Sequence, residues 1–393
     1  MNFELRINLL QEAIRERHLT GAILFYSRDI YYYTGTSQPS YLVVLPGDYR
    51  LFVRRGYDLA LRESGLEAGR IREERNPQAI MALMFPGPGT GEQVGTELDM
   101  LTVPHARSLS RALGGRQLVD ISTEVLQQRM VKDAEEIDSI SRACAAIHAG
   151  HLAAVSGLRA GLSELELAAL VENAQRLAGH EGCFFMRATD FVMSRGPLAS
   201  GPNLRHTSGT LFTLSGAGLS RAVSTGPSRR LIEPGDLVLV DIPACVAGYH
   251  GDQSRTYAVG AAPGKAADLF WSLREVADHL ISSLRPGLTA GEAFALAQAR
   301  ALELGLEESF MAFASKVKAH FVGHGIGLEL NEPPLLARQG DTVLKEGMVL
   351  AIEMHVMESD GLTMKLEDTV HLTAHGAQLL TLSPRELPVV DRS

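Results

Sequence analysis

The sequence predicts an α+β protein with a small N-terminal α/β domain and a larger C-terminal domain that contains an internal repeat. Three observations support this fold class. The chain has 393 residues, more than one domain usually holds. Short apolar runs alternate with helical patterns in roughly the first third of the chain. A six-residue motif then occurs twice, at Leu158 and at Leu284, each time between two helical patterns.

The composition is that of an ordinary globular protein, with 45% apolar and 21% charged residues. A net charge of −9 argues against a nucleic-acid partner, which would require a basic surface. The sequence has no signal peptide and no membrane-spanning apolar run, so we expect a soluble cytoplasmic protein with no membrane partner. Cys144, Cys183 and Cys245 follow no zinc or disulfide spacing, which fits a reducing compartment.

Hydrophobic periodicity assigns the elements of the first domain. Three adjacent tyrosines, Tyr31–Tyr33, are expected to be half-buried strand residues. Two helical patterns over 122–156, broken around Lys132, separate the domains, which we place at residues 1–125 and 126–393. The expected helices of the first domain are 3–17, 57–63 and 104–113, and its expected strands are 22–26, 41–45, 51–53 and 117–121.

The repeated motif reads Leu-Arg-Ala-Gly-Leu-Ser at 158–163 and Leu-Arg-Pro-Gly-Leu-Thr at 284–289. Each copy leads into a helix through a capping box, in which Ser163 pairs with Glu166 and Thr289 with Glu292. Strands follow each helix pair. We therefore expect two similar halves, each of which ends in a two-stranded ribbon: 237–242 with 249–259, and 348–356 with 362–372.

Four carboxylates lie inside these otherwise apolar strands, two in each half, and a histidine lies between two glycines nearby. A carboxylate in an apolar strand is costly unless it is paired or binds a metal. Four carboxylates and one imidazole suit two hard divalent ions that share bridging ligands. Such a pair of ions supports hydrolysis at an amide or similar carbon centre. The five residues are Asp241, Asp252, His324, Glu353 and Glu367.

This set resembles the five-ligand site of the pita-bread metallopeptidases, a superfamily of Xaa-Pro aminopeptidases, prolidases and methionine aminopeptidases. Residues 323–329 are similar to its His motif, residues 367–370 to its last-ligand motif, and residues 248–256 to the flanks of its second Asp. Residues 1–125 resemble a creatinase/prolidase N-terminal domain. The resemblance implies a pita-bread fold, a homodimer, and two divalent ions, with manganese first and cobalt, zinc or iron as alternatives.

The resemblance also implies a role for each residue. Asp241 would bind one ion through both oxygens, His324 would bind the other ion, and Asp252 and Glu367 would bridge the two. Glu353 would bind an ion and take a proton from the attacking water as general base. Glu353 and His324 are therefore the catalytic candidates.

Two histidines that the family usually carries are replaced here, by Ser224 and Asn331. His355 lies two residues after Glu353, and alternate residues of a strand share a face, so it is a candidate to compensate. Ser224, Asn331 and His355 are thus the expected substrate-binding residues. His206 and His250 lie near the expected site, and we expect both to be structural.

Three functions are compatible with these patterns. The leading one is a metal-dependent Xaa-Pro aminopeptidase-like or dipeptidase-like enzyme that cleaves a small peptide with a hydroxide bridging the two ions. The replaced histidines favour an alternative, a hydrolase of the same fold acting on a non-peptide C–N bond, as creatinase-like or ectoine-hydrolase-like members do. A non-catalytic binding module is the third, but such proteins have usually lost ligands, and this chain retains all five.

Overall fold

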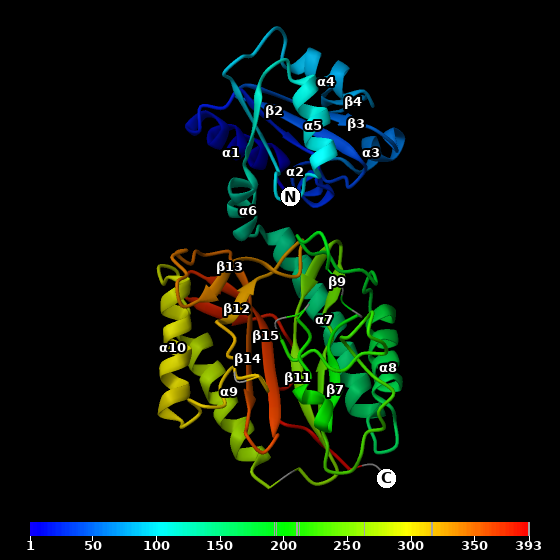
Figure 1. The fold of residues 1–393 in the computed structure, drawn as a ribbon, viewed down its shortest axis with the longest axis vertical. Coiled ribbons are helices and arrows are strands. Elements are labelled where there is room, and N and C mark those ends of the chain that lie inside the picture. Colours follow the sequence, from blue (N-terminus) through cyan, green and yellow to red (C-terminus); the bar gives the residue numbers. More distant parts are fainter. Residues whose placement is uncertain are drawn as a thin grey trace. The chain divides into compact units, whose positions relative to one another are not determined.

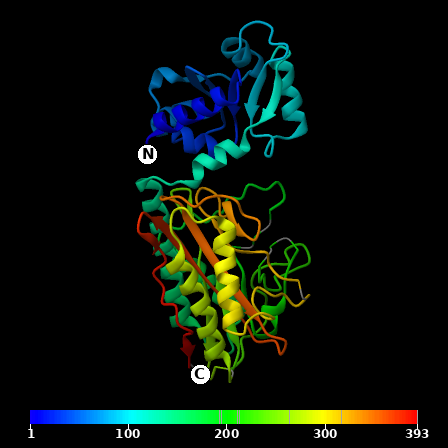
Figure 2. The ribbon, with the colours of Figure 1, turned by 90° about the vertical axis from the view of Figure 1, so that its left-hand side faces the viewer.

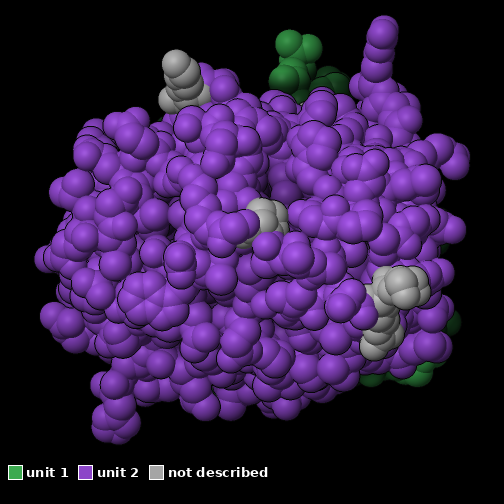
Figure 3. Space-filling model, turned by 90° about the horizontal axis from the view of Figure 1, so that it is seen from below, with its two compact units in different colours: residues 1–129 green, residues 130–393 purple. Residues whose placement is uncertain are grey.

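The computed structural model describes residues 1–391 except 192, 194, 210, 212, 263 and 316. The chain divides into two compact units, Met1–Arg129 and Met130–Ser393, which Figure 3 distinguishes by colour. The boundary expected at residue 125 lies inside helix α6 (Ser122–Met130), at the end of the first unit.

The first unit is a mixed six-stranded sheet with the order β4-β3-β2-β1-β5-β6, flanked by helices (Figure 1). Strand β1 pairs antiparallel with β2 but parallel with β5, so the sheet combines a meander with crossover connections. Ile23, Val43, Phe52 and Val94 are fully buried in its core. The elements are α1 (Phe3–Glu16), β1 (Gly21–Leu24), α2 (Ser27–Thr34), β2 (Ser40–Leu45), β3 (Asp48–Val53), α3 (Tyr57–Glu63), β4 (Ile71–Glu73), α4 (Pro77–Met84), β5 (Gln93–Thr96), α5 (Val103–Ala112) and β6 (Gln117–Asp120).

The prediction of a strand at Tyr31–Tyr33 is wrong, because these residues lie in helix α2. Aromatic residues favour strands, but the buried positions of this segment recur at helical spacing. The helix ends at Gly35, whose left-handed conformation (φ 78°) suits glycine. Asp29 in its first turn forms a buried ion pair with Arg129 at 2.6 Å, which fixes the helix.

The second unit contains a four-stranded sheet, β17-β11-β8-β7, and a five-stranded sheet, β13-β12-β14-β15-β16. Helices α9 and α10 cover the five-stranded sheet, whereas α7 and α8 form a second pair beside the other strands (Figures 1 and 2). The helices are α7 (Ala134–Gly157), α8 (Glu164–Leu177), α9 (Ala266–Ser283) and α10 (Ala290–Glu303). The strands are β7 (Leu198–Ser200), β8 (Leu237–Asp241), β9 (Ala244–Val246), β10 (Tyr249–Gly251), β11 (Ser254–Val259), β12 (Phe321–Gly325), β13 (Glu332–Ala337), β14 (Val349–Met357), β15 (Thr363–Thr373), β16 (Gly376–Leu379) and β17 (Val389–Val390).

The internal repeat appears as two matching helix pairs, each followed by an antiparallel ribbon. Both predicted capping boxes are present, since Ser163 and Thr289 each exchange hydrogen bonds with the glutamate three residues later. The two ribbons, β8–β11 and β14–β15, meet where β11 lies beside β15. There the Thr256 hydroxyl donates to the Lys365 carbonyl oxygen at 2.9 Å and accepts from the Lys365 amide at 3.1 Å. This is the pseudo-two-fold pita-bread arrangement.

The first ribbon is less regular than expected, because its return strand is divided in two. Strand β10 pairs with β9 as a small hairpin, and only β11 pairs with β8. Asp252 and Gln253 lie between them, outside the ladder. The Asp252 amide donates instead to the Thr369 hydroxyl at 3.0 Å, which turns this residue toward the other half.

The core of the second unit packs α9 and α10 against the five-stranded sheet. Leu273, Leu280, Leu350 and Val370 are inaccessible to solvent there. Burying each such side chain contributes roughly 1.5–3 kcal/mol. Among the helices of the described ranges, none is long and apolar enough to cross a bilayer.

Candidate metal centre

The five predicted ligand residues converge in the second unit, and all five are buried. The β14–β15 register places Glu353 directly opposite Glu367. In the β8–β11 ribbon, Ser254 lies opposite Asp241. The Ser254 hydroxyl donates to the Glu367 carboxylate of β15 at 2.7 Å and so joins the two halves. Ligand atoms of Asp252, His324 and Glu367 all lie within 4.8 Å of one another.

An ammonium group lies among these carboxylates. The Nζ atom of Lys365 is 2.7 Å from Asp241, 2.8 Å from Glu353 and 3.0 Å from Glu367. Asp241 and Glu353 come from different halves, so one nitrogen bridges the repeat. Lys365 is not among the site residues predicted from the sequence. Lys365 lies two residues before Glu367 on a strand and therefore shares its face, but the same spacing also fits an ordinary ion pair.

The centre carries more negative charge than Lys365 neutralises. Burial raises the pKa of Asp241 to about 6, although the Lys365 ammonium lowers it. Burial also raises the pKa of Asp252 well above its usual value, and the charges of Glu367 and Asp241 add to this effect. Burial disfavours the Lys365 ammonium, but the surrounding carboxylates outweigh that cost and raise its pKa well above the usual value. A site of this kind favours a multivalent cation.

His324 presents one ring nitrogen to the carboxylates. Its Nδ1 lies 2.9 Å from the Gly325 carbonyl oxygen, so Nδ1–H donates there and Nε2 keeps its lone pair. Nε2 lies 3.7 Å from a Glu353 oxygen. The flanking glycines allow close strand packing, since a Cβ on Gly323 or Gly325 would lie 2.4 Å or 2.2 Å from a neighbouring carbonyl oxygen.

Arg255 of β11 holds strand β15 in place next to the predicted ligands. Arg255 donates to the Asp368 carboxylate at 2.6 Å and to the Glu367 carbonyl oxygen at 2.7 Å, and all three residues are buried. Carboxylate oxygens and one imidazole nitrogen are the donors that hard and borderline divalent ions prefer. The Lys365 ammonium occupies the position of a cation among them, so the residues present fit divalent metal ions.

The centre lies in a cavity of about 180 Å³. All five predicted ligand residues and Lys365 line it, together with the polar residues Thr213 and Asn331. Its other described walls are apolar. They are formed by Met186, Phe191, Met193, Pro197, Leu211, Pro243, Phe321, Leu330 and Leu335.

The three predicted substrate residues lie in different environments. Asn331 lines the cavity, whereas neither Ser224 nor His355 does so among the residues described. Ser224 is exposed, and its hydroxyl lies 3.2 Å from that of Ser208. His355 is buried against Phe313 and turns Nε2 toward the Ala312 carbonyl oxygen at 3.0 Å. Sharing a strand face with Glu353 thus does not bring the His355 ring into the cavity.

The other two histidines are placed as structural residues. His206 is exposed on a loop. His250 is buried, its Nδ1 lies 2.9 Å from the Gly327 carbonyl oxygen, and its Nε2 accepts from the Phe185 amide at 3.1 Å. Both ring nitrogens of His250 are therefore satisfied by backbone groups.

Comparison with known proteins agrees with this architecture. The chain is 28% identical to an Xaa-Pro dipeptidase of Pyrococcus furiosus over 97% of this chain and 99% of the relative. It is 28% identical to a probable dipeptidase PepE of Mycobacterium bovis over 98% and 96% of the two chains. Among solved structures, an Xaa-Pro dipeptidase from Bacillus anthracis superposes with a TM-score of 0.83 at 25% identity, covering 99% of this chain and 100% of that chain.

Two family models match the chain. The creatinase/prolidase N-terminal domain matches residues 6–131, and metallopeptidase family M24 matches residues 138–374. The second match includes all five predicted ligand residues and most of the larger unit. The chain belongs to metallopeptidase family M24.

Proposed function

We propose that this protein is a metal-dependent exopeptidase that hydrolyses short peptides, with Xaa-Pro dipeptides as the leading substrate class. The observation that carries the proposal is the convergence of Asp241, Asp252, His324, Glu353 and Glu367 in one buried cavity. Relatives that match nearly the whole chain are named Xaa-Pro dipeptidases, which supports the substrate class.

In this proposal the five residues hold two divalent ions, with manganese as the first candidate. Bound there, the ions would supply an activated water and polarise the scissile carbonyl. Glu353 would accept the proton of the attacking water, since its carboxylate faces the same space as His324 and Lys365. His324 would bind through Nε2, because Nδ1 donates to the backbone.

The apolar walls would hold the substrate side chains. Met186, Phe191 and Leu330 give the cavity surfaces suited to an aliphatic side chain or a pyrrolidine ring. Asn331 would donate to a substrate carbonyl or accept from its amine.

A second candidate is hydrolysis of a non-peptide C–N bond. It is favoured by the small number of histidines at the cavity. Of the described residues that line the cavity, His324 is the only histidine. Asn331 therefore leaves the described walls without a second imidazole to carry a proton to the leaving nitrogen, since Ser224 lies outside the cavity and His355 is turned away. Simple Xaa-Pro dipeptides would then be slow substrates.

The test is a substrate panel with matched variants. Metal-stripped protein reloaded with manganese is assayed on Xaa-Pro dipeptides, dipeptides without proline, longer Xaa-Pro peptides and N-substituted amides. We expect hydrolysis of one of these classes by wild type and a loss of about 100-fold or more in Asp252→Ala, with the exposed control Asp360→Asn unchanged. An Asp252→Ala protein with full metal content and full rate would overturn the assignment.

The metal, the assembly and the location form the remainder of the proposal. Manganese as the natural metal and a homodimer are inferred from the family resemblance, and a cytoplasmic location from the cysteine spacing, the N-terminal pattern and the hydropathy of the sequence. Elemental analysis of protein purified without added metal, with sedimentation analysis of the same sample, tests the first two. A tagged chain in cell fractions tests the third.

A further inference from the structure

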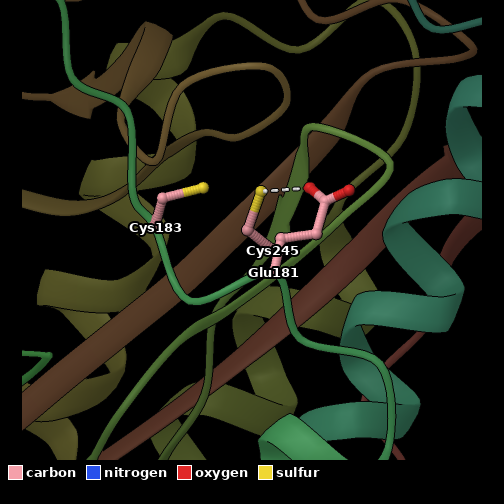
Figure 4. Close-up of side chains that lie close together, drawn as sticks. All are labelled: Glu181, Cys183 and Cys245. Atoms are coloured by element: carbon pink, nitrogen blue, oxygen red, sulfur yellow. Dashed lines mark hydrogen bonds between the residues drawn. The ribbon is translucent and has the colours of Figure 1, made fainter.

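A second group of metal-binding side chains lies outside the carboxylate centre (Figure 4). It consists of Glu181, Cys183 and Cys245, whose ligand atoms all lie within 4.8 Å of one another. Glu181 and Cys183 belong to the segment after α8, and Cys245 lies in β9. In Figure 4 the Cys183 sulfur points toward the Cys245 sulfur, which a dashed line joins to the Glu181 carboxylate. None of the three is among the described residues that line the cavity.

Backbone contacts hold the two segments together. The Glu181 amide donates to the Cys245 carbonyl oxygen at 2.8 Å, and the Cys245 amide donates to His180 Nδ1 at 2.8 Å. The segment therefore runs along β9 for at least two residues. These two hydrogen bonds hold the backbone of Glu181 against that of Cys245 without using the thiols.

The Glu181 carboxylate is also oriented. It accepts from the Gly248 amide at 2.9 Å, and the Cys245 thiol lies 3.5 Å from the same oxygen. Gly248 follows Ala247, and both have positive φ, of 78° and 52°, so a tight left-handed turn aims this amide at the carboxylate. A backbone donor on one carboxylate oxygen is the kind of support that surrounds metal ligands.

Two guanidinium groups hold the same stretch of chain. Arg176 donates to the His180 carbonyl oxygen at 2.5 Å, and Arg195 donates to the Gly182 carbonyl oxygen. Cysteine binds metals as the thiolate, and a bound divalent ion itself favours that form. Glu181 is exposed and Cys183 is partly exposed, so an ion can reach the group from solvent.

We propose that Glu181, Cys183 and Cys245 form a second metal site, which binds one thiophilic divalent ion of the zinc class. Zinc binds thiolate sulfur at about 2.3 Å and carboxylate oxygen at about 2.0–2.2 Å, so its ligand atoms lie roughly 3.5–4 Å apart. The observed group needs only a small contraction to reach that spacing. Three protein ligands leave the fourth tetrahedral position to water. Two sulfur ligands distinguish this site from the carboxylate centre, which offers only oxygen and nitrogen.

The site would control one wall of the cavity. The same segment continues to Phe185, whose amide donates to His250 and whose carbonyl oxygen accepts from Leu330 at 2.8 Å. The next residue, Met186, lines the cavity beside Leu330. A bound ion would tie this segment to β9 and hold the wall in place. The inference does not depend on which substrate the cavity takes.

Cobalt(II) tests the proposal, because thiolate ligands give it an intense near-ultraviolet charge-transfer absorption that oxygen and nitrogen ligands do not. The reduced, metal-stripped full-length protein is titrated with cobalt chloride. We expect wild type to develop the thiolate band, and Cys183→Ser and Cys245→Ser to lose it while still binding cobalt at the carboxylate centre. Cys144→Ala, a third cysteine outside the group, serves as the matched control and should keep the band.

A second measurement uses only wild type, so it does not depend on the folding of the variants. Alkylation of Cys183 by iodoacetamide is followed by mass spectrometry with and without zinc chloride, and zinc should slow it at least tenfold. Asp252→Ala should show the same protection, since that residue belongs only to the carboxylate centre. The proposal is overturned if cobalt-loaded wild type shows no thiolate band, or if zinc leaves the alkylation rate of Cys183 unchanged.

Discussion

At the scale of single residues, Lys365 sets the electrostatics of the carboxylate centre. Its ammonium contacts three of the four carboxylates, and these come from both halves of the repeat. A metal ion that enters this space meets a positive charge already in place. Two unit charges 4 Å apart interact by about 4 kcal/mol at an effective dielectric constant of about 20. Lys365 therefore stabilises the metal-free centre and opposes the binding of divalent ions.

The position of the Lys365 ammonium predicts how Lys365→Met changes metal affinity. Removing the ammonium leaves the carboxylates unneutralised, so the metal-free variant should unfold at a lower temperature than wild type. Manganese should bind at least about tenfold more tightly, equivalent to about 1.4 kcal/mol. Calorimetric titration of metal-stripped protein measures the affinity, and the exposed Lys345→Met is the control. Equal or weaker manganese binding by Lys365→Met would contradict the prediction.

The two replaced histidines give a second prediction, because only one of the positions lines the cavity. Asn331→His would place an imidazole beside the centre, whereas Ser224→His would place one on the exposed surface. We expect wild type to cleave Xaa-Pro dipeptides with kcat/KM below about 10⁴ M⁻¹s⁻¹. Asn331→His should raise this value by about 10²-fold, the lower end for proton-transfer catalysis, and Ser224→His should leave it unchanged.

Steady-state kinetics on the same dipeptide, at the same metal loading, compares the three proteins. The contrary result is a wild type with a kcat/KM above this threshold and no increase in Asn331→His. That result would show that the missing imidazole does not limit the reaction. The non-peptide alternative would then lose its support, and the plain dipeptidase function would stand.

At the scale of elements, a buried contact joins helix α7 to strand β11. His151 Nδ1 lies 2.7 Å from the Tyr257 hydroxyl, and His151 is only 5% exposed. Burial, together with the charges of Arg255 and His148, lowers the pKa of His151 from 6.5 to about 4. The folded protein therefore favours neutral His151, which makes this contact sensitive to acid.

The sign of the resulting pH dependence follows from linkage. The folded pKa lies below the unfolded value, so the stabilisation is complete above pH 6.5 and is lost as the pH falls toward 4. At about 1.4 kcal/mol per pKa unit, the loss is at most about 3 kcal/mol. His151→Gln keeps a partner for Tyr257 but cannot titrate. Urea unfolding at pH 7 and pH 5 should show a smaller loss of stability for the variant, and equal losses would contradict this assignment.

The elements also show which parts of the site the sequence could predict. Asp241 and Glu353 interrupt runs of aliphatic residues, and this local cost signals a buried polar site without any knowledge of contacts. Lys365 gives no such signal, since a lysine next to acidic residues in a strand also fits an ordinary ion pair. Cys183 and Cys245 come together only because the segment after α8 runs along β9, a contact that no local pattern encodes.

At the scale of the whole molecule, the domain order and the internal repeat were predictable because both rest on periodicity and on a repeated capping motif. The helical conformation of the α2 tyrosines was not predictable. Aromatic residues favour strands, and this conflicts with the helical spacing of the buried residues over so short a segment. All five predicted ligand residues and the described cavity residues belong to the second unit, which has its own core.

This organisation predicts that a fragment starting at α6, residues 122–393, folds and binds metal by itself. Circular dichroism and calorimetric titration with manganese should give a cooperative unfolding transition and an affinity within about threefold of the full chain, because no predicted ligand is removed. The same fragment carrying Asp252→Ala is the control for site-specific binding. A soluble, folded fragment that fails to bind manganese would show that residues before 122 complete the centre.

The hydrogen bond from Ser254 to Glu367 spans the seam between the halves, and Lys365 links Asp241 to Glu353. Predicted ligand residues from early and late positions of the chain thus meet at this seam. During translation, a chain that has emerged only as far as the first ribbon contains Asp241 and Asp252 but no hydrolytic centre. If these residues form the proposed centre, hydrolysis can begin only after Glu367 has left the ribosome and both halves have closed, so synthesis itself would keep the nascent chain inactive.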